Sequence, residues 1–319
     1  MTSSHKLILI TLFSLVIALL APWVGLSDIA DDILKQQILL DIRVPRVLFA
    51  FVAGAGLSLC GMVFQAMFHN PLATPFTLGV ASGASFGAAC TVFLGINVSL
   101  FGFDIITIGA FIGALVAITF VFFISQLQRG FSSETLLLTG VATSFFFSSL
   151  ILFIQYLSDM TDSFMIMRWL MGGLTSASYH SLLQLIPVVT VSTAIILWLS
   201  RELNLLMAGD DIALSRGVSV RQVRYLLFFS TSLCVGGIVA LSGPIGFIGM
   251  MVPHICRLII GTDHRWLTPA TIMFGGGFLI LCDGIARLLI APAEIPVGII
   301  TTLLGGPFFL WLLIKRRQA

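Results

Sequence analysis

The run FDIITIGAFIGALVAITFVFFIS, residues 103–125, contains a single charged side chain, Asp104, which lies near its beginning. At a rise of about 1.5 Å per residue, a helix of this length crosses the roughly 30 Å hydrocarbon core of a bilayer. The whole chain has the same character, because 58% of its 319 residues are hydrophobic and only 9% are charged. In a soluble domain about a quarter of the residues are charged. The sequence therefore predicts a protein whose surface faces mostly lipid.

Similar apolar runs recur along the chain, and they are continuous. A membrane β-barrel would instead show alternating segments of about ten residues. We therefore expect an all-α, polytopic integral membrane protein with about ten transmembrane helices in a single transmembrane domain, residues 1–319. The run at 163–174 is too short to span and is interpreted as an interfacial segment. The expected spans are 7–26, 47–67, 77–96, 103–125, 135–157, 181–200, 224–243, 247–262, 268–290 and 297–314.

Small residues recur at helix-packing spacing within two of these spans. Gly79, Gly83 and Gly87 form a G-x-x-x-G-x-x-x-G ridge, and Gly109 and Gly113 form a second pair. Such ridges let helix backbones approach closely where lipid supplies no hydrophobic drive for association. The pattern predicts close helix packing and indicates no particular activity.

The loops predict the orientation in the membrane, since cytoplasmic loops carry an excess of Lys and Arg. If the N-terminus is cytoplasmic, most of these residues fall inside and both termini are cytoplasmic. Arg43, Arg46 and Arg287 fall outside, against the rule. The residues alone leave two interpretations open. These arginines anchor lipid headgroups, or they form a docking patch for an acidic partner outside the membrane.

One cytoplasmic loop, RELNLLMAGDDIALSRGVSVRQVR at 201–224, is long and polar for this chain. Asp210 is expected to act as an N-cap, Gly217 to end the helix, and a second short helix to begin at Ser219. Two short helices in such a loop would offer a surface to a cytosolic partner. A merely solvated connector is the alternative.

Several activities lack their motifs in this chain. The three lysines (Lys6, Lys35 and Lys315) follow no glycine, so the chain has no P-loop, and any ATPase is expected to be a separate chain. We expect no enzyme, because Ser82 and His254 are the best candidates for a hydrolase pair and nothing in the sequence joins them. Scattered histidines and unpaired cysteines predict no metal site and no cofactor. Basic residues that flank the membrane indicate no nucleic-acid partner.

An ion-coupled secondary transporter is a serious alternative. Such transporters carry ionisable groups at the depth of the membrane. Asp283 and Arg287 are four residues apart near the end of a span, which predicts an i,i+4 ion pair rather than a proton relay. So few charges favour the passage of a bulky ligand that is driven by another subunit.

Six segments in register closely resemble the FecCD family of ABC importer permeases, which includes cobalamin, haem and ferric-siderophore permeases. These segments are RVPRVLFAFVAGAGLSLCGMVFQAMFHNPLATPFTLGVASGAS (43–85), LLLTGVATS (136–144), WLMGGL (169–174), LLMAGDDIALSRGVSVRQVR (205–224), GPIGFIGMMVPHICRLIIGTDHRWLTPA (243–270) and ARLLIAPAEIPVGIITTLLGGPFFLWLL (286–313). The resemblance covers nearly the whole chain in order, and six segments together are highly specific.

The resemblance implies a permease subunit with ten helices in the bacterial inner membrane. It implies a dimer of permeases, for which a heterodimer with a second, similar subunit is favoured. An ATP-binding subunit dimer would power transport by alternating access, and a periplasmic binding protein would deliver the substrate. A ferric siderophore is the expected substrate, with haem or cobalamin as alternatives.

The resemblance also implies roles for particular residues. The binding protein is expected to dock on Arg43, Arg46 and Arg287. A cytoplasmic gate is expected at Ser132, Ser133 and Glu134, where Glu134 departs from the small hydroxyl residues expected in the family. Contact with the ATPase is expected at Met207, Asp210, Asp211, Arg216, Gly217 and Val223.

Overall fold

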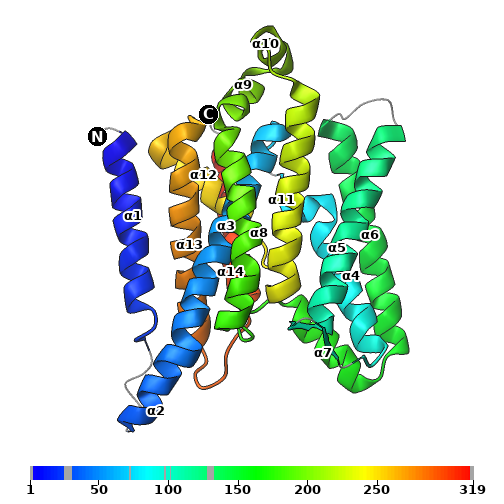
Figure 1. The fold of residues 1–319 in the computed structure, drawn as a ribbon, viewed down its shortest axis with the longest axis vertical. Helices are drawn as coiled ribbons and strands as arrows, with labels where there is room; N and C mark the ends of the chain where they lie inside the picture. Colours follow the sequence, from blue (N-terminus) through cyan, green and yellow to red (C-terminus); the bar gives the residue numbers. More distant parts are fainter. Residues whose placement is uncertain are drawn as a thin grey trace.

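The computed structural model describes residues 3–24, 31–71, 73–96, 98–100, 102–127 and 133–316, which form a bundle of helices with one short hairpin (Figure 1). In chain order the elements are α1 (Ser3–Leu20), α2 (Asp32–Gln37), the π-helix η1 (Ile38–Arg43), α3 (Val44–Met67), the 3-10 helix η2 (Pro75–Leu78), α4 (Val80–Phe93), β1 (Ser99–Leu100), β2 (Phe103–Asp104), α5 (Ile105–Leu127), α6 (Ser133–Leu157), α7 (Met160–Leu170), α8 (Tyr179–Trp198), α9 (Ser200–Ala208), α10 (Asp210–Ser215), α11 (Val220–Ser242), α12 (Ile248–Ile260), α13 (His264–Leu288) and α14 (Val297–Arg316).

The expected membrane spans are confirmed. Among the described residues, seven helices are long and apolar enough to cross a membrane, and three shorter apolar helices (α4, α12 and α14) occupy the other expected spans. The span expected at 77–96 begins later than predicted. Gly79 has a φ of 76°, which separates η2 from α4. The short run expected at 163–174 is the helix α7.

The two ends of the bundle differ (Figure 1). Both chain ends lie at the end that carries α9 and α10, whereas α2 and α7 lie at the opposite end. We call these the α9–α10 end and the α7 end. The helix containing α3 is long because α2, η1 and α3 run together without a break from Asp32 to Met67.

The helix α3 lies at the centre of the bundle and is buried along nearly its whole length. Its small residues permit this, because a Cβ on Gly54 would collide with the carbonyl of Gly275 on α13. Two members of the predicted ridge, Gly83 and Gly87, pack in the same way on α5, because a Cβ on either would collide with the carbonyl of Gly113 or Gly109. The third, Gly79, precedes α4 and faces Thr143 on α6.

Candidate functional site

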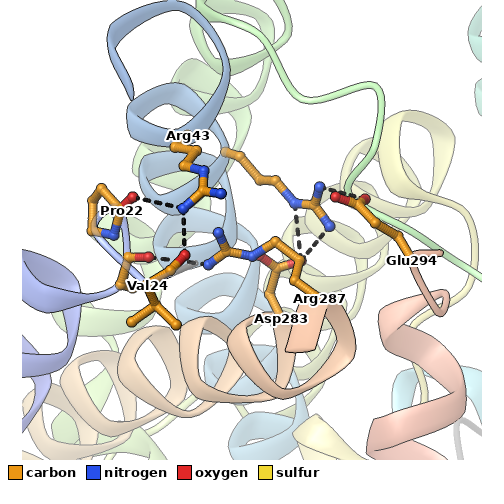
Figure 2. Close-up of polar contacts among 8 residues, drawn as sticks. Pro22, Val24, Arg43, Asp283, Arg287 and Glu294 are labelled. Atoms are coloured by element: carbon orange, nitrogen blue, oxygen red, sulfur yellow. Dashed lines mark hydrogen bonds and ion pairs between the residues drawn. The ribbon is translucent and has the colours of Figure 1, made fainter. Parts of the chain in front are cut away.

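The three arginines predicted to dock a partner lie together at the α7 end. Arg43 and Arg46 come from the junction of η1 and α3, and Arg287 comes from the last turn of α13. Arg46 and Arg287 meet at Asp283, which lies one turn before Arg287, and Arg43 lies beside them (Figure 2). We call these residues, with Glu294, the arginine cluster.

Asp283 holds two of the arginines at once. Arg46 Nε and Nη2 donate hydrogen bonds to Asp283 Oδ1 at 3.0 and 2.8 Å. Arg287 Nε lies 3.2 Å from Asp283 Oδ2, so the i,i+4 ion pair expected from the sequence is confirmed. All three side chains are buried, with exposed fractions of 8% for Arg46, 1% for Asp283 and 9% for Arg287. The carboxylate therefore joins α3 to α13.

Glu294 is the accessible acid of the cluster. It lies between α13 and α14, and its Oε2 accepts a hydrogen bond from Arg46 Nη1 at 2.7 Å. Its side chain is 40% exposed, in contrast to the buried Asp283. Glu294 also lines a cavity of about 470 Å³ that is walled by α7, the segment after it and the end of α11.

The arginines also bind the segment that follows α1. Arg43 Nη1 donates to the carbonyl oxygen of Pro22 at 3.2 Å and to that of Val24 (Figure 2). Arg287 Nη2 donates to the carbonyl oxygen of Ala21 at 3.2 Å. Some of the N–H donors of these guanidinium groups are therefore already hydrogen-bonded within the chain.

The charge balance of the cluster is positive. Three guanidinium groups, which stay ionised in proteins, face two carboxylates, so one positive charge is left over. The sequence placed Asp283 beside Arg287 but missed Arg46, which is 237 residues away. The available signal was an acidic residue inside an expected span, because such a group needs a partner there.

At the α9–α10 end, the residues expected to contact an ATPase lie on α10, on the turn after it and on the flanking helices. Met207, Asp211 and Arg216 are exposed. Asp210 Oδ1 forms an ion pair with Arg224 Nη2 at 2.7 Å, which joins α10 to α11. Gly217 has a φ of 80°, Asp210 is part of the first turn of α10, and Val223 is buried with 9% exposure.

Two local expectations for this loop need correction. The N-cap of α10 is Gly209, with a φ of 122°, and not Asp210. A helix does begin where expected, with Ser219 as its N-cap, but it is the long α11, and the second short helix is α9, which precedes α10. Residues from Val220 onward belong to the spanning helix α11, because Val220, Val223 and Leu227 continue one buried face into the bundle.

The expected gate is described only in part. Ser132 lies outside the described residues, Ser133 is the first residue of α6, and the Glu134 side chain is exposed in the first turn of that helix. The candidate hydrolase residues lie in ordinary packing positions. Ser82 Oγ donates to the carbonyl of Gly79 at 3.0 Å, and the His254 ring packs edge-on against Phe308.

Comparison with known proteins identifies the family. The model of the FecCD transport family matches residues 7–315. The hemin transport system permease HmuU of Yersinia pestis is 40% identical over 283 residues, which cover 88% of this chain and 84% of HmuU. The molybdate import system permease MolB of Haemophilus influenzae is 37% identical over 297 residues, which cover 93% of this chain and 86% of MolB.

A solved structure of an inward-facing ABC transporter, assigned to the metal-chelate type, matches with a TM-score of 0.89 and 34% identity. The match covers 98% of this chain and 99% of that chain. Relatives of this kind are permease subunits, so this chain is a transport component rather than an enzyme, and the ATPase is a separate subunit. Family match, relatives and fold agree over nearly the whole length, and the chain belongs to the FecCD transport family.

Proposed function

We propose that this ABC importer permease carries a metal chelate, with a ferric siderophore as the first candidate and haem and cobalamin as alternatives. The observation that carries the proposal is the placement of the arginine cluster at one end of the bundle and the α9–α10 pair at the other. The similarity to a metal-chelate-type transporter and to a hemin permease supports the chelate class. Molybdate, an oxyanion, is the competing cargo, because MolB imports it.

In this proposal the α7 end faces the periplasm of a bacterial inner membrane, and both termini are cytoplasmic. An acidic binding protein docks on Arg43, Arg46 and Arg287. The uncompensated positive charge of the cluster would attract such a partner and would speed its association. Arg43 is the most accessible of the three, because it is half-buried whereas Arg46 and Arg287 are buried.

At the opposite end, the α9–α10 pair is the contact for the ATPase dimer. Its exposed apolar side chains support this role, because Met207, Ile212 and Leu214 are 39%, 48% and 58% exposed on two short helices. Asp210, Asp211, Arg216, Gly217 and Val223 complete the proposed coupling region. The cytoplasmic gate is proposed at Ser132, Ser133 and Glu134.

Transport by alternating access requires a path between two permease subunits. We propose that a second, similar permease completes the dimer and that the heterodimer is the physiological form. The cavity at the α7 end supports a path entrance there, because Phe164, Met165, Met167, Trp169 and Met171 give it a largely apolar and polarisable lining. A bulky chelate fits such a lining better than a small, strongly hydrated oxyanion does.

The test measures import into proteoliposomes that contain the assembled transporter, with its ATPase, its binding protein and ATP. Labelled ferric siderophore, hemin, cobalamin and molybdate are compared. ATP-dependent import of a chelate with no import of molybdate is expected. Import of molybdate alone would overturn the chelate class. Import that needs an ion gradient and continues without the ATPase would instead establish a secondary transporter.

Docking is tested with Arg43→Glu in the same assay, and Lys35→Glu is the control because Lys35 is a cation on α2 at the same end. Arg43→Glu should raise the concentration of binding protein needed for half-maximal import several-fold, and the effect should shrink at high salt. Equal effects of the two substitutions would refute docking at the arginine cluster.

A further inference from the structure

We propose that Asn204 is a positioning residue that passes the movement of the α9–α10 pair to α13. The inference rests on the proposed contact of that pair with the ATPase. Asn204 lies on α9, and among the described residues its side-chain hydrogen bonds go to Asp263 and His264 at the start of α13. It belongs to the polar loop 201–224, but it is not one of the six residues expected to contact the ATPase.

The contact is a three-bond clasp. Asn204 Nδ2 donates to Asp263 Oδ1 at 2.9 Å. Asn204 Oδ1 accepts from the His264 backbone N–H at 3.0 Å and lies 2.7 Å from His264 Nδ1. Asp263 is itself the N-cap of α13, because its Oδ1 accepts from the Arg265 backbone N–H at 3.1 Å. One amide therefore holds both the cap and the first residue of this helix.

The position of this clasp distinguishes it from the other contacts of the pair. The Asp210–Arg224 ion pair joins α10 to α11, which follows it in the chain. The His69 ring bonds the Leu206 carbonyl at 2.8 Å, which joins α9 to the end of α3. Asn204 reaches α13, a helix that begins 60 residues later in the chain and is not a sequence neighbour of α9.

The helix α13 connects the two functional ends of the bundle. It begins at the clasp, and in its last two turns it carries Asp283 and Arg287 of the arginine cluster. At about 1.5 Å per residue, its 25 residues span roughly 37 Å. It packs on α3 without room for side chains between Gly54 and Gly275. A shift of its first turn is therefore passed to the close contact between α13 and α3, which cannot yield without moving one backbone against the other.

Two consequences follow from the physics of coupled sites. Packed helices move as units between discrete arrangements. If ATP binding shifts α9, the clasp forces α13 to follow, and the arginine cluster changes with it. Coupling between two binding events is reciprocal, so a docked binding protein must also influence the ATPase through the same contact.

The experiment uses isosteric exchanges in the assembled transporter in nanodiscs. Asn204→Asp places two carboxylates face to face and breaks the clasp. The double variant Asn204→Asp/Asp263→Asn restores one amide and one carboxylate with their positions exchanged, so it is the matched control. The readout is the ATP hydrolysis rate with loaded binding protein divided by the rate without it. Asn204→Asp should bring this ratio close to 1, and the double variant should return it to within about twofold of wild type.

A second readout needs neither substrate nor binding protein. Spin labels at Leu288 and Leu94, which are 53% and 64% exposed at the α7 end, report the distance between α13 and α4 with and without ATP. The change seen in the wild type should be absent in Asn204→Asp and present in the double variant. If Asn204→Asp fails to assemble, Asn204→Ala removes the amide without adding charge.

The outcomes separate this inference from the proposed function. A wild-type response in Asn204→Asp or Asn204→Ala, or no recovery in a folded double variant, overturns the positioning role. A wild type that shows no ATP-dependent distance change also overturns it. A wild type whose distance changes but that imports no chelate overturns the substrate proposal and leaves the role of Asn204 standing.

Discussion

The substitution Asp283→Asn is the sharpest test of the arginine cluster. It keeps the shape of the side chain and removes the charge that forms ion pairs with both Arg46 and Arg287. The two guanidinium groups then remain buried, with exposed fractions of 8% and 9%, and only the half-exposed Glu294 still neutralises one of them. The variant therefore isolates the electrostatic contribution of the buried carboxylate.

The expected loss follows from the burial of these groups. Breaking a buried ion pair by neutralising one partner costs about 3–5 kcal/mol, because the remaining charge is left uncompensated. At about 2.1 cal/mol/K per residue, the unfolding entropy of a chain of 319 residues is about 0.67 kcal/mol/K, so 1 kcal/mol corresponds to about 1.5 °C in Tm. We therefore expect the Tm of the detergent-solubilised permease to fall by about 4–8 °C.

The assay is thermal unfolding followed by size-exclusion chromatography. Asp41→Asn is the control, because Asp41 lies in η1 at the same end and its side chain is exposed. That control should change Tm by about 1 °C or less, as surface substitutions usually change stability by under about 0.5 kcal/mol. The double variant Asp283→Asn/Arg287→Gln should recover part of the loss, since it removes one uncompensated charge. If Asp283→Asn behaved like Asp41→Asn, the buried network would make no contribution and the reasoning would be refuted.

Two further predictions concern packing and pH. Gly61→Ala should destabilise the permease by about 1–3 kcal/mol or prevent its expression, because the added Cβ would collide with the backbone of α12, whereas Gly284→Ala, which meets open space, should be tolerated. The hydrogen bonds to Asp263 from the Arg265 backbone N–H and the Asn204 amide lower the pKa of Asp263 below its ordinary value. Because the folded pKa is the lower one, the stabilisation is present above the ordinary value of about 3.9 and is lost as the pH falls through the folded pKa. Asp263→Asn should therefore flatten the acid side of a plot of Tm against pH, and an unchanged acid limb would contradict the prediction.

The positions of the spans follow from the sequence because each of these helices satisfies its own backbone hydrogen bonds. An apolar run of sufficient length therefore identifies a span without knowledge of its neighbours. This held for the run 135–157, which is α6 (Ser133–Leu157), and for the short run 247–262, which is α12 despite Pro253. The spacing of Gly83 and Gly87 also predicted a close helix contact, because spacing along one helix defines which residues share a face.

Local capping in the polar loop was predicted less well. Asp210 was expected to cap its helix, but its carboxylate pairs with Arg224, and a glycine with a positive φ occupies the cap position. An Asp side chain can accept from a backbone N–H or from a guanidinium group, and the sequence does not show which partner lies nearer. The sequence also did not predict α9. Its Leu203 and Leu206 are buried because other helices of the bundle cover them, and the sequence of the loop does not show that cover.

The sequence alone thus determined the all-α membrane fold and the positions of its apolar spans. Only the tertiary structure decided which polar groups pair between segments that are far apart in the chain. Arg46 meets Asp283 across 237 residues, and Asn204 meets Asp263 across 59. Hydrophobic length is a property of one segment, whereas an ion pair or a hydrogen bond depends on where two segments are placed by the packing of the whole bundle.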